Sequence, residues 1–151
     1  DDRQSMPNHP FANSSFRQAS ILIVNENFGS GSSREHAPQA LQRWGLSACV
    51  GESFSEIFQG NATTIGFPCV TASHDDIEFL MTAAERAPQA PMTLSIETLS
   101  LDAEGRTVSL QMPPVVRDSF LSGHWDATGL LLDRFDEVRA VAAELPYVKG
   151  F

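Results

Sequence analysis

The strongest constraint on the fold is an alternation of short apolar runs with amphipathic segments between residues 20 and 90. The apolar runs at 21–24, 46–50 and 67–71 are flanked by polar residues or glycine, which is typical of buried strands. Each run is followed by a segment whose apolar residues recur at helical spacing. Strand and helix in strict alternation predict a parallel βαβ core with right-handed crossovers.

Start and stop signals locate the helices of this core. The first is expected to begin near residues 34–37, with Pro38 in its first turn, and to end at Gly45. Its predicted apolar face consists of Ala37, Ala40, Leu41 and Trp44.

Two further helices are indicated in the same way. A Ser-x-x-Glu capping box at Ser53 and Glu56 predicts a short helix, and a longer one is expected over 74–87, ahead of Pro88. The predicted apolar side of the short helix is Phe54, Ile57 and Phe58, and that of the longer helix is Ile77, Leu80, Met81 and Ala84.

The second half of the chain has a different pattern. Residues 92–97 and 107–111 alternate as strands do and flank a turn-forming stretch at 102–106, which predicts an antiparallel hairpin. Helical segments follow Pro113-Pro114, the last from about Asp133 with Val138, Val141, Ala142 and Leu145 on one face. We therefore predict one α/β domain over 1–151: an irregular arm (1–19), the βαβ core (20–90), then the hairpin and C-terminal helices (91–151).

Charge and hydropathy limit the possible partners. Hydrophobic residues make up 42% of the 151-residue chain and the formal net charge is −9, which disfavours nucleic acid and anionic membranes. No apolar run approaches the roughly 20 residues that a membrane span requires. The polar start of the chain, without an apolar segment behind it, predicts a cytoplasmic protein. An anionic ligand would need local capture by arginine.

The sequence also restricts metal chemistry. Cys49 and Cys69 are expected to be small buried side chains, and two cysteines are too few to ligate an iron–sulfur cluster. The four histidines show no spacing typical of zinc ligands. No cofactor is therefore expected on this chain, and any cluster must belong to another.

The segment 28–37 combines a glycine-rich turn with the start of a helix. Gly29 and Gly31 allow positive φ and close approach of a ligand. Helix N-termini favour anions, and Arg34 can clamp a carboxylate with two hydrogen bonds. The hydroxyls of Ser32 and Ser33 stand in this electropositive setting. The simpler alternative is a helix cap, with Ser32 or Ser33 as the N-cap residue.

A resemblance favours the functional interpretation. The run Gly31-Ser32-Ser33-Arg34-Glu35-His36-Ala37 resembles the motif of the swivelling domain in the aconitase superfamily. The wider stretches 19–41 and 51–58, and more weakly 125–129, are similar to bacterial small subunits of 3-isopropylmalate dehydratase. The likeness covers most of the chain and implies a swivel-like β/β/α fold.

The resemblance also implies roles. Ser32 would be the general base that takes a proton from the carbon next to a substrate carboxylate. Gly31, Ser32, Ser33 and Arg34 would bind the hydroxy-dicarboxylate substrate. A large partner subunit, in a heterodimer or heterotetramer, would carry a [4Fe–4S] cluster. The reaction implied is the isomerisation of 2-isopropylmalate to 3-isopropylmalate by dehydration and rehydration in leucine biosynthesis.

Two departures from the family leave alternatives open. Ser30 stands where these small subunits usually have cysteine, and the chain begins after the segment that carries an Asp-Thr-Asp motif and a substrate-recognition loop. The alternatives are the small subunit of a related hydro-lyase, of the homoaconitase or citraconate/methylmalate type, and a non-catalytic module that binds anions or a partner. His36, which ends the Arg-Glu-His run, is expected to orient the loop.

Overall fold

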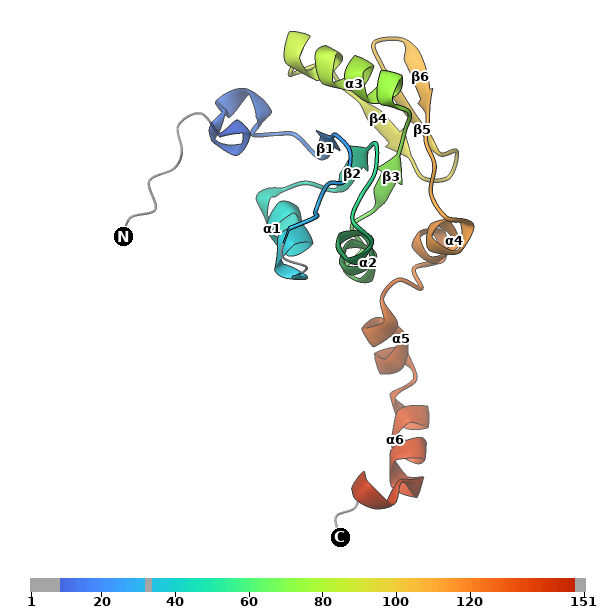
Figure 1. Ribbon diagram of the computed structural model, residues 1–151. Helices are drawn as coiled ribbons and strands as arrows, with labels where there is room; N and C mark the ends of the chain where they lie inside the picture. Colours follow the sequence, from blue (N-terminus) through green and yellow to red (C-terminus); the bar gives the residue numbers. More distant parts are fainter. Residues whose placement is uncertain (1–8, 32–33, 149–151) are drawn as a thin grey trace, which may run out of the picture.

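The structure, a computed structural model, describes residues 9–31 and 34–148 (Figure 1). Two 3-10 turns, Pro10–Ala12 and Ser14–Phe16, precede the first strand, and a third, Pro146–Val148, follows the last helix. Between them the elements run β1 (Ile21–Val24), α1 (His36–Trp44), β2 (Ala48–Gly51), α2 (Glu56–Thr64), β3 (Cys69–Thr71), α3 (His74–Arg86), β4 (Thr93–Ser95), β5 (Ser100–Ala103), β6 (Arg106–Ser109), α4 (Pro114–Ser122), α5 (Ala127–Asp133) and α6 (Phe135–Glu144).

The parallel core is confirmed. β1, β2 and β3 lie side by side in that order and pair in parallel. Leu22 is opposite Cys49, and Cys49 is opposite Cys69. Figure 1 shows α1 and α2 on one side of this sheet, with α3 and the second sheet on the other.

Successive side chains of β2 and β3 face two different cores, as the two-residue period of a strand requires. Cys49 and Cys69 face a cluster formed with α1 and α2, whereas Val50 and Val70 face one formed with α3 and the second sheet. All four are buried. Because both faces are covered, these strands read as continuous apolar runs in the sequence.

The second sheet has three antiparallel strands, one more than the predicted hairpin. β5 lies between β4 and β6, so the two predicted strands do not pair directly. The predicted turn at 102–106 is narrower than expected, since Ala103 still belongs to β5 and Arg106 already belongs to β6. Thr71 and Gln111 exchange two backbone hydrogen bonds, which join this sheet to β3.

The predicted apolar face of α1 is partly wrong. Leu41 is buried and Trp44 is half-buried, but Ala37 and Ala40 are exposed and Pro38 is buried instead. The helix starts at His36 and ends at Gly45, which has φ +119°, as its stop signal predicted.

The predicted capping box of α2 is also wrong. Ser55, not Ser53, is the N-cap residue, and its hydroxyl accepts a hydrogen bond from the Phe58 backbone N–H at 3.4 Å. Phe58 is buried as expected, but Ile57 is exposed. The helix therefore starts later and is rotated relative to the prediction.

α3 and the C-terminal helices form where they were expected. Ser73 caps α3, whose residues Ile77 and Leu80 are fully buried. α5 and α6 extend away from both sheets (Figure 1). Within residues 9–31 and 34–148, no helix is both long and apolar enough to cross a bilayer.

Candidate functional site

The glycine-rich segment follows β1, and the connection 52–55 follows the neighbouring strand β2. Both therefore leave the carboxyl edge of the parallel sheet. Ligands of open α/β sheets bind outside the carboxyl ends of the strands, so this edge is where a site is expected.

Hydrogen bonds fasten the start of the segment to the connection beside it. Phe28 N–H donates to the Ser53 carbonyl at 3.1 Å, and Ser55 N–H donates to the Phe28 carbonyl at 2.8 Å. Asn27 N–H donates to the Ser53 hydroxyl at 2.7 Å, and the Ser55 hydroxyl donates to the Gly29 carbonyl at 2.8 Å. The backbone that enters the loop is thus fixed on one side by four bonds.

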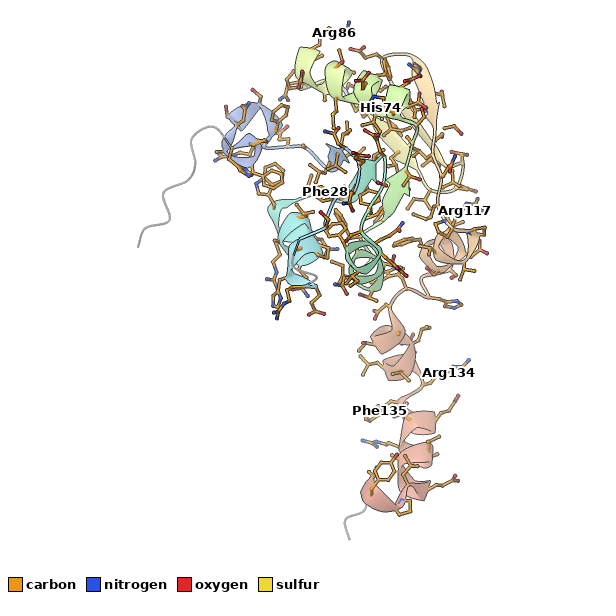
Figure 2. The ribbon with its side chains drawn as sticks, viewed as in Figure 1. Phe28, His74, Arg86, Arg117, Arg134 and Phe135 are labelled. Atoms are coloured by element: carbon orange, nitrogen blue, oxygen red, sulfur yellow. The ribbon has the colours of Figure 1, made fainter. Side chains whose placement is uncertain are left out.

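Gly29 is the closest point of this contact. Its φ is +81°, and a Cβ placed there would lie 2.4 Å from Cγ of Phe58. Phe28, labelled in Figure 2, meets Phe58 edge to face with ring centroids 5.3 Å apart. Phe54 stacks on Phe58 with ring centroids 6.2 Å apart. Only glycine fits between the turn and this aromatic group.

The predicted site residues divide into two groups. Gly31 and Arg34 are described and exposed. Ser32 and Ser33 lie outside the described residues. The N-cap position of α1 is Glu35, which makes no side-chain cap hydrogen bond. A serine cap at position 32 or 33, the simpler alternative, therefore does not match where this helix begins.

The start of α1 offers fewer free donors than a generic helix. The Ala37 N–H already donates to the Arg34 carbonyl at 3.1 Å, and Pro38 has no N–H. The other N–H donors at this helix start are those of Glu35 and His36. Anion binding here must depend more on the Arg34 guanidinium than a helix N-terminus alone would suggest.

A charged group at the same edge was missed at the level of sequence. His74, the first residue of α3, lies 3.1 Å from a Glu52 carboxylate oxygen and 3.5 Å from one of Glu78. The hydrogen bond that the His74 ring donates to the Glu52 carboxylate, followed by the charges of Glu52 and Glu78, raises the pKa of His74. In the sequence Glu52, His74 and Glu78 form no recognisable motif, because only the fold brings Glu52 next to His74.

This group borders an open hollow that includes Glu26, Glu52, Glu78 and Glu85 among its lining. Four carboxylates and a single imidazole give the hollow a negative potential. A dicarboxylate would be repelled here. Arg34, the predicted carboxylate clamp, lies in the neighbouring glycine-rich segment.

The cysteines behave as the sequence predicted. Both are free and buried, and burial raises the pKa of Cys69 to about 12 and that of Cys49 further. Such thiols are poor nucleophiles and poor metal ligands. Across the described residues, no group of three or more potential ligands lies together to hold a metal ion.

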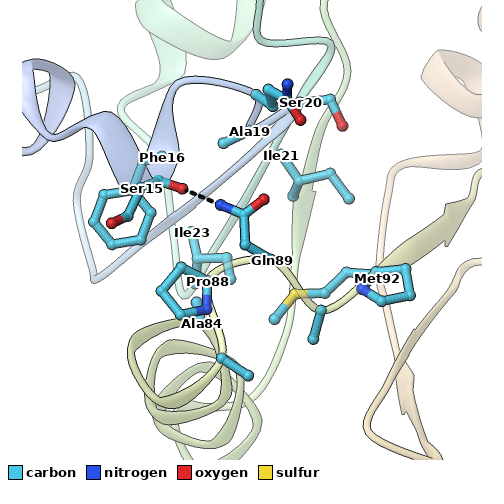
Figure 3. A pocket seen from close by; sticks show the side chains of 14 residues that line it. Ser15, Phe16, Ala19, Ser20, Ile21, Ile23, Ala84, Pro88, Gln89 and Met92 are labelled. Atoms are coloured by element: carbon cyan, nitrogen blue, oxygen red, sulfur yellow. Dashed lines mark hydrogen bonds between the residues drawn. The ribbon is translucent and has the colours of Figure 1, made fainter.

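Another hollow, of about 280 Å³, lies at the opposite end of β1 (Figure 3). It is lined by Ser15, Ile21 and Met92 among others, and Gln89 Nε2 donates to the Ser15 carbonyl at 2.7 Å across it. Its lining contains no charged side chain. It therefore does not suit an anionic substrate and is distinct from the glycine-rich loop.

Comparison with known proteins finds relatives that match almost the full length of this chain. The sequence is 42% identical over 149 residues to the 3-isopropylmalate dehydratase small subunit of Synechocystis sp., covering 98% of this chain and 74% of that protein. The chain belongs to the family of 3-isopropylmalate dehydratase small subunits. The small subunit of Thermus thermophilus is 40% identical, over 97% of this chain and 73% of the relative.

Two further comparisons agree. The aconitase C-terminal domain family matches residues 1–74, which contain the whole glycine-rich loop. The crystal structure of a 3-isopropylmalate dehydratase from Methanocaldococcus jannaschii superposes with a TM-score of 0.56 at 22% identity, covering 82% of this chain and 67% of that one. This neighbour supports the predicted fold class, which is confirmed.

Proposed function

We propose that this chain is the cytoplasmic small subunit of a 3-isopropylmalate dehydratase, which interconverts 2-isopropylmalate and 3-isopropylmalate with an iron–sulfur large subunit in leucine biosynthesis. The observation that carries the proposal is the 42% identity over 98% of the chain to a protein of that name. The anchored glycine-rich loop at the carboxyl edge of the sheet supports it. Within this proposal, residues 1–151 act as one swivel domain.

Ser32 is the proposed general base. Its alkoxide accepts the proton from the carbon next to a substrate carboxylate, the electron pair forms a C=C bond, and the hydroxyl on the adjacent carbon leaves. Rehydration in the other orientation returns the proton from Ser32 to the neighbouring carbon. An alkoxide needs cations and N–H dipoles around it, and Arg34 and the start of α1 would provide them.

Arg34, with Gly31 and Ser33, is the proposed substrate clamp. The exposed guanidinium can bind one carboxylate in the two-bond geometry that a lysine cannot reproduce. Gly31 leaves open space around its Cα, so the backbone there can be approached closely.

The large subunit would carry the [4Fe–4S] cluster, because the two buried cysteines of this chain are unsuited to ligation. A bound cluster would supply a Lewis-acidic iron for the leaving hydroxyl. The residues of this chain would orient the substrate and move the proton.

The test uses the complex of the full chain with its large subunit. Ser32→Ala should abolish turnover of 2-isopropylmalate while substrate affinity and subunit association stay within about twofold, because carboxylate binding rests on Arg34. Ser30→Ala, in the same loop, is the matched control and should retain activity. A folded Ser32→Ala complex with substantial turnover would contradict the base assignment.

Arg34→Lys tests the clamp. We expect kcat/KM to fall. The expected loss of transition-state stabilisation is roughly 2–4 kcal/mol, the usual range when one partner of a buried charge pair is truncated. Arg43→Lys, in the last turn of α1, is the matched control.

Turnover of homocitrate or a citraconate-type substrate, but not 2-isopropylmalate, would favour a related hydro-lyase. No turnover of any would favour a binding module.

A further inference from the structure

The C-terminal helices α5 and α6 form an arm that covers none of the body. Neither hydrophobic cluster of the described chain includes a residue of these helices. Figure 2 shows the arm, with Arg134 and Phe135, extending beyond α4. We refer to residues 127–148 as the arm.

The arm is apolar on more than one side. One groove along it is lined by Leu130, Leu131, Val138, Val141 and Leu145. Four more large apolar side chains lie outside that lining: Leu132, Phe135, Tyr147 and Val148. Together with Leu130, Leu131 and Val141 they are 41% to 67% exposed. α6 also carries Asp136, Glu137, Arg139 and Glu144, so it is an amphipathic helix, and the apolar face of such a helix is normally covered. Seven large exposed apolar side chains on so short a segment are typical of a surface that a partner covers.

Some of the arm's charged side chains have partners within the arm. Arg134 lies 3.7 Å from Glu137, and the Arg139 guanidinium stacks 4.7 Å from the centre of the Phe135 ring. These contacts occupy part of the arm's charge. Asp133, Asp136 and Glu144 are also exposed, so a partner would meet apolar side chains together with these carboxylates.

The root of the arm is fixed beside the candidate site. Trp125, just before α5, packs so closely on Gly66 that a Cβ there would lie 2.7 Å from its ring. Gly66 follows the C-terminal end of α2, whereas Gly29 rests on Phe58 in the first turn of α2. A nine-residue helix is only about 14 Å long. A protein that covers the glycine-rich loop therefore lies within reach of the arm.

We propose that the arm is the docking element for the large subunit, whose own helices or strands cover its apolar faces. This inference rests on the proposed function, since the large subunit is the protein that must approach Arg34 to complete the site. A second copy of this chain is the weaker candidate occupant, because each copy carries a net charge of −9 and the two would repel.

The experiment measures the affinity of the full chain for its iron–sulfur large subunit by titration calorimetry. Leu131→Gln and Val141→Gln remove apolar contact area and keep helix propensity. Val115→Gln is the matched control, because Val115 is an exposed apolar residue of α4, outside the arm. We expect each arm variant to bind about tenfold or more weakly, as for residues central to an interface, and the control to bind within about twofold.

Three outcomes separate the possibilities. Unchanged affinity in both arm variants, with an active wild-type complex, overturns the docking proposal and leaves the proposed function standing. A chain that dimerises alone by sedimentation equilibrium, and becomes monomeric in the arm variants, assigns the arm to a second copy and also overturns it. An absent or inactive wild-type complex overturns the proposed function instead. Circular dichroism of each variant confirms that the helices persist.

Discussion

The Ser55 hydroxyl makes two contacts that a single substitution removes together. It accepts from the Phe58 N–H at 3.4 Å as the N-cap of α2, and it donates to the Gly29 carbonyl at 2.8 Å. The long capping bond places Ser55→Ala near the low end for a lost cap, about 0.5 kcal/mol. The lost bond to Gly29 adds about 1 kcal/mol. We expect a total near 1.5 kcal/mol and a fall in Tm of about 3–6 °C.

The activity of the complex should fall by more than this stability loss implies. Gly29 precedes the candidate base and clamp, so freeing its carbonyl shifts the loop relative to the sheet. Misplacing a catalytic group by about 1 Å costs up to a hundredfold, and we expect kcat to fall at least about tenfold at a temperature where the variant is folded.

Ser73→Ala is the matched control for this experiment. Ser73 is also a serine N-cap, of α3, and its hydroxyl also makes a second hydrogen bond, to the Asp76 carboxylate at 2.7 Å. It makes no hydrogen bond to the glycine-rich loop among those of the described residues. The control should lower Tm by a similar amount and leave kcat unchanged. If the two variants retain equal kcat, the bond from Ser55 to Gly29 does not position the loop.

Three further predictions follow from single residues. Gly29→Ala should destabilise the protein by about 2–4 kcal/mol in chemical denaturation, because it combines a left-handed φ with a clash on Phe58; an unchanged midpoint would contradict this geometry. Cys69, with its pKa raised to about 12, should resist alkylation by iodoacetamide at pH 8 until the chain is unfolded, and rapid labelling of the native protein, read by mass spectrometry, would show it accessible. The raised pKa of His74 means that its pairing with Glu52 stabilises the fold fully below the pKa of the unfolded state, and that this contribution is lost as pH rises through the folded value. The Tm difference between wild type and His74→Gln should therefore shrink from pH 5 to pH 9, and a difference that grows would reverse the sign.

The sequence was most informative where one local pattern decided the structure. The apolar runs that became β1, β2 and β3 are buried on both faces, so nothing in their composition conflicted with their position. β5 was missed because the turn before it uses Leu99 at φ +49°, and leucine gives no turn signal. Two candidate caps, Ser53 and Ser55, lie two residues apart, and only the tertiary contact with Gly29 distinguishes them.

For the candidate site, residue types could be predicted but their support could not. Gly31, Ser32, Ser33 and Arg34 stand out in a short run of sequence, and the roles of all four stay predictions. The bond from Ser55 to Gly29 spans 26 positions, as does that from Asn27 to Ser53, and no local rule links such residues. The same holds for Glu52 and His74, which meet only because parallel strands bring their carboxyl ends to one edge.

The position of the arm in the chain has a consequence for how the protein is made. Every residue of the two hydrophobic clusters lies at or before Phe120, whereas the arm begins at Ala127. Synthesis proceeds at about 5–20 residues per second from the N-terminus, so the ribosome releases the complete set of core residues before the exposed leucines of α5. The exposed apolar side chains of the arm therefore emerge after the residues of both hydrophobic clusters. This order shortens the interval in which apolar side chains of the arm and of the unfolded body could associate wrongly.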